Sequence, residues 1–354
     1  MKKLIALSLC LLMLLPAVLT ACGTEDPTEA ATSAPTSAPT SAPTAAPTET
    51  PTVTPDAATT VKFGLGMAIG TPSATDATDD KNGAGKIDIT FAAITVDADG
   101  KIVAVEIDTA SNTASYTVDG EAVASEFKTK YELGNDYNMV AYGGAAKEWF
   151  EQVDAFEAAI VGKTLAEIKA LVAEGGKGTE EVLTAGCTIT ITDFVLAVED
   201  AFADATVEVS ADATVALGIA TEQSCTDATD DKDGSNKLST YVFASATDAN
   251  GKVLVASSDC IEVSFTFDVD GATTLDTTAA IVSKKDKGDA YGMVAHGGAA
   301  KEWFEQAAAF DAACIGKTKA EIAGLIAETG KGVDSLLAAG CTIYISGFIK
   351  AATK

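Results

Sequence analysis

Apolar and polar residues alternate in the first part of the chain beyond residue 60. Residues 61–69 form an apolar-rich run, and a later segment alternates polar residues with Ile87, Ile89 and Phe91. A period of two is typical of a strand that buries one face. The apolar positions then change phase at Ala92-Ala93, which predicts a β-bulge there. Residues 97–100, Asp-Ala-Asp-Gly, predict a hairpin turn into a strand on which Val103, Val105 and Ile107 share a face.

The next part of the chain changes to a helical period. Apolar residues separated by four, three and four positions predict an amphipathic helix: Trp149, Val153, Phe156 and Ile160. Gly162 is expected to end it. Residues 164–167 and 318–321 are capping boxes that open further helices, and a last helix is expected after Thr192. Strands followed by helices predict an α+β fold, with C-terminal helices packed on an antiparallel sheet.

The pattern occurs twice. Residues 139–152 recur at 293–306 with one change, from Tyr142 to His296. Residues 75–81 recur unchanged at 226–232, and 185–189 recur at 339–343. We therefore predict two tandem copies, 61–205 and 212–354, joined by a linker over 206–211. Each copy has the size of a domain, so each is expected to fold by itself.

The start of the chain has a different character. A basic start and an apolar run over 4–15 lead to Leu19-Thr20-Ala21-Cys22-Gly23, which resembles the lipobox of bacterial lipoproteins. That resemblance implies a signal peptide over 1–21 and a diacylated Cys22 as the first mature residue; an ordinary secretory signal with a chance cysteine is the alternative. Residues 22–60 hold seven of the nine prolines and predict an extended stalk. The expected location is the outer face of the cell membrane, with the stalk reaching into a Gram-positive type of envelope.

Charge narrows the possible partners. The chain has 51 acidic and 24 basic residues, every basic one a lysine, for a net charge of -27. Nucleic acid is excluded as a natural partner because binding phosphates needs clustered cations. Docking onto anionic lipid is disfavoured, so the membrane contact is expected through the lipid anchor. Without arginine, an anionic ligand must be held by backbone amides, by lysine or covalently.

Several kinds of site find little support. The one histidine, His296, is a tyrosine in the other copy, so neither a catalytic triad nor a zinc site can occur in both. Residues 76–80 and 227–234 resemble a fragment of a calcium loop without its closing glutamate, and are interpreted as solvated acidic turns.

The glycine pairs leave two interpretations open. Gly143-Gly144 and Gly297-Gly298 are expected to turn into a helix, with Lys147 or Lys301 in its first turn. Such a turn can bind an anion through backbone amides and the lysine, or it can be a plain helix entry.

The five cysteines beyond Cys22 also suggest roles. Cys225 and Cys260 occur only in the second copy, where the first has Ala74 and Thr109, which predicts a disulfide between them. Two further cysteines share one position in the copies and are expected to be buried thiols: Cys187 and Cys341. Cys314 is expected to pair with Cys341 or to stay free.

Residues 184–194, continuing to 203, resemble the end of the FMN-binding domain. That family includes flavin subunits of sodium-pumping quinone oxidoreductases and extracellular flavinylated lipoproteins. Its motif is an acid, then Ser/Thr-Gly-Ala-Thr and a helix, and the last threonine carries FMN through a phosphoester. The resemblance implies FMN acceptors and motif glycines in both copies: Thr188, Thr342, Gly186 and Gly340. The chain departs from the motif by having Ala185 and Ala339 for the Ser/Thr, Cys187 and Cys341 for the Ala, and an acid out of register.

Two functions follow as hypotheses. The first is a covalent flavin carrier that passes electrons between a membrane redox partner and an external acceptor, with chemistry supplied by FMN. The second is a cofactor-free module that binds a cell-wall component or is structural, with duplication adding avidity. In both, a carrier or binding protein is favoured over a turnover enzyme, and a solute receptor is the least favoured reading.

Overall fold

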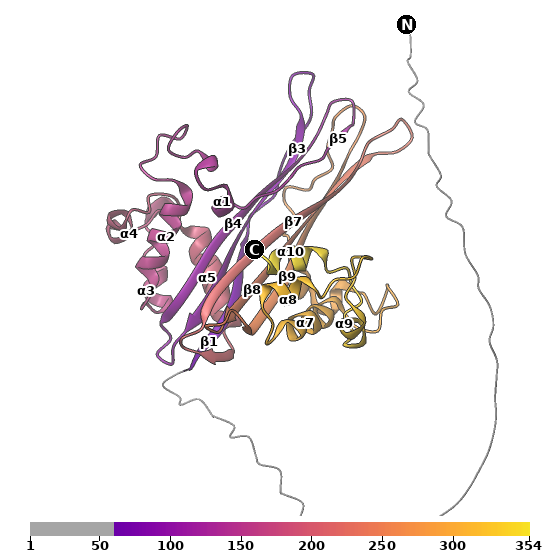
Figure 1. Ribbon diagram of the computed structural model, residues 1–354. Helices are drawn as coiled ribbons and strands as arrows, with labels where there is room; N and C mark the ends of the chain where they lie inside the picture. Colours follow the sequence, from indigo (N-terminus) through magenta and orange to yellow (C-terminus); the bar gives the residue numbers. More distant parts are fainter. Residues whose placement is uncertain (1–59) are drawn as a thin grey trace, which may run out of the picture. The chain divides into compact units, whose positions relative to one another are not determined.

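The computed structural model describes residues 60–354 (Figure 1). The predicted signal peptide, the lipidation site Cys22 and nearly all of the stalk lie outside the described residues. Within 60–354, no helix combines the length and the apolar character that crossing a membrane requires. The described residues belong to one compact unit.

The first copy builds a six-stranded antiparallel sheet in the order β5-β4-β3-β1-β6, with β2 paired to β3. Its strands are β1 (Thr60–Ile69), β2 (Ser73–Thr75), β3 (Gly83–Val96), β4 (Ile102–Tyr116), β5 (Ala122–Val123) and β6 (Val207–Ser210). The second copy builds a three-stranded sheet from β7 (Thr214–Thr226), β8 (Gly234–Thr247) and β9 (Val253–Phe267). The predicted α+β class with antiparallel sheets is confirmed.

Helices follow the strands in both copies. The first copy contains α1 (Lys130–Leu133), η1 (Gly134–Tyr137), α2 (Trp149–Ile160), α3 (Leu165–Lys169), η2 (Glu174–Gly176), α4 (Glu180–Ala185) and α5 (Thr192–Asp204). The second contains α6 (Lys284–Lys287), η3 (Gly288–Tyr291), α7 (Trp303–Cys314), α8 (Lys319–Ala323), α9 (Asp334–Ala338) and α10 (Ser346–Ala352). Both predicted capping boxes form, at Thr164 and Thr318.

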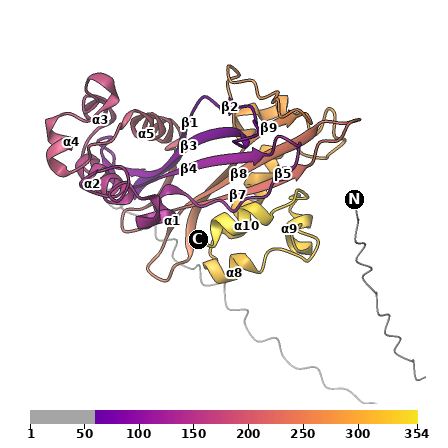
Figure 2. The same ribbon diagram turned by 90° about the horizontal axis from the view of Figure 1, so that it is seen from above.

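The two sheets pack face to face, and each carries its helices on the outer face (Figures 1 and 2). The core between the sheets takes side chains from both copies, including Phe91 and Tyr116 of the first and Leu238 and Phe267 of the second. The helices pack closely on the strands: a Cβ on Gly66 would lie 2.0 Å from the backbone nitrogen of Ala201 in α5. Both copies therefore contribute to one central core, and whether each copy folds by itself stays a prediction.

Strand β3 has no bulge at Ala92-Ala93, where the sequence predicted one; instead, both of its faces are buried there. Ile89, Phe91 and Ala93 belong to the core between the sheets, whereas Ala92 and Ile94 belong to the core under the helices. The change of phase therefore marks the point where the second face becomes buried, and the β3–β4 register runs through it unbroken. The register shift lies at Thr95/Val96, opposite Val103. Val103 is accordingly exposed, and does not share the buried face of Val105 and Ile107.

The predicted linker is also part of a sheet. Residues 207–210 form β6, which pairs with β1 from Thr60↔Ser210 to Phe63↔Val207. The segment that connects the copies thus closes one edge of the first sheet.

The repeated acidic turns join the copies through reciprocal hydrogen bonds. The Ala77 amide donates to the Gly271 carbonyl at 2.8 Å, and the Ala228 amide donates to the Gly120 carbonyl at 2.7 Å. Asp76 accepts from the Thr273 amide at 3.0 Å, and Asp227 accepts from the Ala122 amide at 2.9 Å. Each contact has its counterpart with the copies exchanged, which is the pattern of an isologous twofold interface. We call these two sets of bonds the reciprocal latch. At the same end of the sheets, Tyr116 stacks on Phe267 with ring centroids 4.3 Å apart.

The predicted Cys225–Cys260 disulfide is wrong. Both thiols are free, and they lie on the two outer strands of the second sheet. Cys225 pairs with Asn236 of β8, whereas Cys260 pairs with Tyr241. Those two partners are five residues apart, or roughly 17 Å along the strand. A disulfide needs Cα atoms within roughly 7 Å. Cys314 and Cys341 are free and buried, as is Cys187.

Candidate functional site

Thr188 and Thr342 lie at matching points in the turn that leads to the last helix of each copy, α5 or α10. Both residues are exposed, whereas the cysteine that precedes each is fully buried. The turn is set by Gly186 and Gly340, whose φ angles of 108° and 94° lie in the left-handed region that favours glycine. The motif glycines predicted from the sequence therefore have a structural reason.

A buried glutamine holds each threonine. The backbone amide of Thr188 donates to Gln152 Oε1 at 2.8 Å, and its hydroxyl donates to the same oxygen at 2.9 Å. Gln306 holds Thr342 with the same two distances. The Gln152 side-chain amide in turn donates to the Lys147 carbonyl at 3.0 Å. These glutamines were not predicted; their identity in both copies at a buried position of the helix was the available signal.

Lysines approach each threonine turn from two directions. The ammonium of Lys147 lies over Gly186, where an added Cβ would come within 2.3 Å of it. Lys177 donates to the Thr188 carbonyl at 2.7 Å. In the second copy, Lys301 donates to the Ala339 carbonyl at 3.0 Å, and Lys331 stands over the ring of Tyr344. In a chain with a net charge of -27, Lys147 and Lys177 bring two cations to the first turn, and Lys301 brings one to the second.

The cysteines of the two turns face inward. Cys187 and Cys341 are fully buried in the cores under the helices. Burial raises the pKa of each thiol to about 11, so both stay protonated and unreactive near neutral pH. They occupy the position where the FMN-binding motif has alanine. The structure thus requires a small, buried side chain there, which cysteine can supply.

The glycine loops do not form the predicted anion site. The Glu148 carboxylate accepts from the Met139 amide at 2.8 Å and from the Val140 amide at 3.2 Å. Glu148 and Glu151 also form a capping box at the start of α2, and Glu302 and Glu305 repeat it at α7. Because the protein's own carboxylates occupy these helix ends, an anion on Gly143-Gly144 or Gly297-Gly298 would be repelled.

Lys147 and Lys301 do not lie in the first turn of a helix, where the sequence predicted them. Each precedes the N-cap instead of lying in the first helical turn, and each reaches the threonine turn. Trp149 and Trp303 are buried, as their helical spacing indicated.

Two partly buried carboxylates were not predicted as a pair. Glu157 of α2 accepts from the Ile107 amide at 2.6 Å, and Asp311 of α7 accepts from the Ser258 amide at 3.1 Å. Burial raises the pKa of Glu157 to about 8 and that of Asp311 to about 6. These groups pin the helix to strand β4 or β9. Among the described residues, no group of three or more His, Cys, Asp and Glu side chains is arranged to hold a metal ion.

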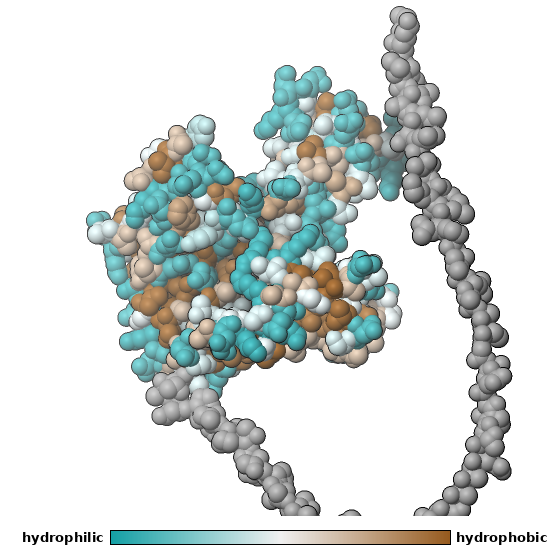
Figure 3. Space-filling view, in the orientation of Figure 1, coloured by the Kyte–Doolittle hydropathy of each residue, from teal (hydrophilic) through white to brown (hydrophobic). Residues whose placement is uncertain are grey.

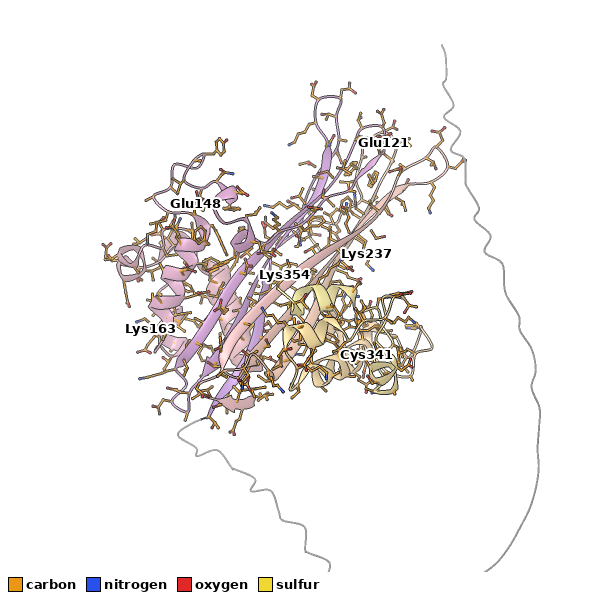
Figure 4. The ribbon with its side chains drawn as sticks, in the orientation of Figure 1. Glu121, Glu148, Lys163, Lys237, Cys341 and Lys354 are labelled. Atoms are coloured by element: carbon orange, nitrogen blue, oxygen red, sulfur yellow. The ribbon has the colours of Figure 1, made fainter. Side chains whose placement is uncertain are left out.

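The labelled side chains show where the two helical layers lie relative to the paired sheets (Figure 4). Glu148 lies among the helices of the first copy, and Cys341 among those of the second, on opposite sides of the paired sheets. Glu121 lies at the far end of the strands, near the reciprocal latch. That end is coloured mainly as hydrophilic in Figure 3. The threonine turns belong to the helical layers.

Comparisons with known proteins give one similarity. No protein-family model matches the chain, and no solved structure matches it. A chlorophenol reductase from Desulfitobacterium hafniense is 30% identical over 127 residues, which is 32% of this chain and 38% of the reductase. The chain thus matches about two fifths of that relative's length. Its sequence is similar to a redox enzyme over about a third of the chain.

Proposed function

We propose that the protein is a redox carrier of the outer cell surface that binds FMN covalently through Thr188 and Thr342. The observation that carries the proposal is the repeated arrangement of an exposed threonine, a buried glutamine that accepts from its hydroxyl, and a lysine over the preceding glycine. The similarity to a reductase adds support for redox chemistry. Electrons would pass between a membrane redox partner and an acceptor outside the cell.

The residues at the threonine turn suit a phosphoester. Gln152 Oε1 accepts the Thr188 hydroxyl hydrogen, which orients the hydroxyl oxygen before attachment. A phosphoester would replace that hydrogen, and Gln152 would still hold the Thr188 backbone amide. A phosphodiester carries a negative charge, and Lys147 and Lys177 are the cations close enough to offset it. Bound FMN would supply reversible electron transfer, while the protein fixes its phosphate end.

The decisive experiment uses protein from its own host, which would contain the transferase that attaches the flavin. We expect absorption in the visible range and an intact mass above that of the polypeptide by one or two FMN units, each less a water. Thr188→Ala and Thr342→Ala should each remove one unit, and the double variant should be colourless.

Thr184→Ala is the matched control, because Thr184 is exposed on α4 two residues before Gly186. It should keep both units. Colourless wild-type protein with the mass of the polypeptide alone would overturn the proposal.

A second candidate is a cofactor-free surface module. It is favoured by the way the protein satisfies its own polar groups: the glutamines already bond both threonine hydroxyls, and glutamates fill the helix ends. In that case the purified protein would be colourless, fully folded and bound to isolated cell walls.

The location is proposed from the lipobox. Cys22→Ala should release the protein from the membrane fraction into the medium, since one acyl-modified residue would provide the anchor. Retention of the variant on membranes would contradict the lipid anchor without affecting the flavin proposal.

A further inference from the structure

The segment that follows each threonine is held by an isolated antiparallel β-bridge. In the first copy the bridge joins Lys177 to Thr190, and in the second copy it joins Lys331 to Tyr344. The backbone therefore places an equivalent lysine beside each threonine turn. The residue opposite that lysine differs between the copies: it is a threonine in the first, and in the second a tyrosine that is 65% exposed.

The side chains of the two lysines take different directions. Lys177 donates to the Thr188 carbonyl at 2.7 Å, so its ammonium lies at the threonine itself. The ammonium of Lys331 instead lies 5.5 Å from the centroid of the Tyr344 ring. That distance is typical of a cation–π contact, in which the ring face attracts the ammonium. The tyrosine thus holds, in the second copy, the cation that reaches the threonine in the first.

The buried cysteine that precedes each threonine senses the same difference in charge. Burial raises the pKa of Cys187 and the pKa of Cys341 to about 11. The positive charges of Lys147 and Lys177 both act to lower the pKa of Cys187, whereas Lys301 supplies the lysine charge that acts on the pKa of Cys341. Two lysine charges therefore act on the first turn, and one acts on the second.

A phosphate group at either turn should be sensitive to a single lysine. The chain has a net charge of -27, so its overall field repels an anion and nearby cations must offset that repulsion. At an exposed site, a cation–π contact favours the ring-bound position of a lysine by about two- to fivefold. The ring therefore reduces the share of time that the lysine of the second copy can spend at the phosphate, and the reduction is reversible.

We propose that Tyr344 withholds Lys331 from the second turn, and that the first turn is consequently the preferred site for the flavin phosphate. This inference rests on the proposed attachment of FMN and adds the order in which the two sites are loaded. Two lysines face a phosphate at the first turn, and one faces it at the second. Protein that carries a single flavin should accordingly carry it on Thr188.

The first experiment measures loading in full-length protein from its own host, collected while loading is incomplete. Mass mapping of peptides gives the modified fraction at Thr188 and at Thr342. We expect the first fraction to exceed the second by about two- to fivefold. Tyr344→Thr should raise the second fraction toward the first, and Thr190→Tyr should lower the first toward the second. Tyr344→Phe, which keeps a ring for the lysine, should stay at the wild-type ratio.

A lysine variant assigns the effect to the cation. In the wild-type background, Lys331→Gln should change loading of the second site little, because the ring already holds the ammonium. In the Tyr344→Thr background, the same substitution should remove the gain. If Tyr344→Thr raised loading equally in the presence of Lys331→Gln, access past the ring would control the site, and the inference would be wrong.

Inorganic phosphate gives a readout that needs no flavin. Unmodified protein from a host without the transferase is titrated with phosphate at low ionic strength, while the amide NMR shifts of Thr188 and Thr342 are followed. The dissociation constant should be lower at the first turn by about two- to fivefold. Tyr344→Thr should narrow the difference, and added salt should shrink it through screening.

The outcomes separate this inference from the attachment of FMN. Equal loading and equal phosphate binding at the two turns, neither altered by Tyr344→Thr, would overturn the inference and leave the attachment intact. Colourless wild-type protein from its own host would overturn the attachment, and the phosphate titration would still decide whether the two turns differ.

Discussion

The two copies keep the same threonine turn but place it on different cores. The distances from Gln152 to Thr188 equal those from Gln306 to Thr342, although Val153 is replaced by alanine in the second copy. The second sheet also lacks counterparts of β5 and β6 among the described residues. The geometry of the turn therefore depends on the left-handed glycine and the glutamine, and tolerates changes in core volume. That independence is what allows a surface site to persist while the scaffold under it diverges.

The largest expected effect on stability comes from removing a buried aromatic ring, either from the core between the two sheets or from the core under the helices of the second copy. Phe267 lies between the sheets and stacks on Tyr116, whereas Phe310 lies under the helices of the second copy. Alanine at either position should lower the free energy of unfolding by about 3–5 kcal/mol, because both rings are fully buried. Hydrogen exchange after Phe267→Ala should speed up in both copies. After Phe310→Ala, the increase through local openings should be concentrated in the second copy.

Denaturant unfolding gives the corresponding thermodynamic test. A single transition for wild-type protein would agree with the shared core, since neither sheet can expose that face alone. Two separated transitions, with Phe267→Ala shifting one of them only, would show that the copies are independent domains.

The carboxylates of Glu157 and Asp311 should make the stability of the protein depend on pH over two different ranges, one for each copy. Burial raises the pKa of Glu157 to about 8 with Glu106, Asp154 and Asp108 contributing repulsion, and the pKa of Asp311 to about 6. A raised carboxyl pKa means that the folded state binds more protons than the unfolded state. Stability should therefore fall as pH rises from about 4.5 to 8 through Glu157, and from about 4 to 6 through Asp311. Between pH 6 and 8, only Glu157 of this pair contributes.

Urea unfolding at several pH values checks this assignment. Glu157→Gln, which stays neutral and keeps an acceptor for the Ile107 amide, should flatten the slope between pH 6 and 8. Asp311→Asn should flatten the slope below pH 6 and leave the upper range unchanged. An unaltered profile in Glu157→Gln would show that other groups cause the pH dependence.

Local features of the fold could be predicted because they depend on neighbours in the chain. The capping boxes at Thr164 and Thr318 and the helix through Trp149 form as the spacing indicated. The packing of the two sheets could not be predicted, since alternation of apolar residues does not say what covers each face. The same limit caused the error at Ala92-Ala93: burial by a second layer resembled a bulge.

The residues of the candidate site also differ in whether the sequence alone could predict them. Gly186 and Gly340 were found through a motif that is contiguous in sequence, and the structure gives them the left-handed backbone that the turn needs. Gln152 and Lys177 lie 36 and 11 residues from Thr188, so only the fold brings them to it. The Cys225–Cys260 error has the same origin. Both cysteines are missing from the first copy, but this says nothing about the distance between them in the second.

A smaller effect is expected from the glutamine of the turn. Gln152→Leu leaves the Thr188 amide without its partner, which should cost about 1–3 kcal/mol of stability. It should also reduce FMN loading at the first site, because the hydroxyl is no longer oriented. Gln306→Leu should do the same at the second site only. The two sites are read separately by mass in Thr342→Ala and Thr188→Ala backgrounds, and undiminished loading in both variants would remove the glutamine from the site.

The smallest expected effect concerns the reciprocal latch, where the two copies should behave alike. Asp76→Ala and Asp227→Ala each remove one charged acceptor from a backbone amide of the other copy, so each should cost about 1 kcal/mol. Asparagine at either position keeps an acceptor oxygen and should recover part of the loss.

If these turns instead bound calcium, added Ca²⁺ would raise the Tm of wild-type protein by mass action, and the alanine variants would lose that rise. Equal losses that do not depend on Ca²⁺ would show that the acidic repeat fastens the copies together. A loss confined to Asp76→Ala would show that the apparent twofold symmetry of the contacts does not extend to their energies.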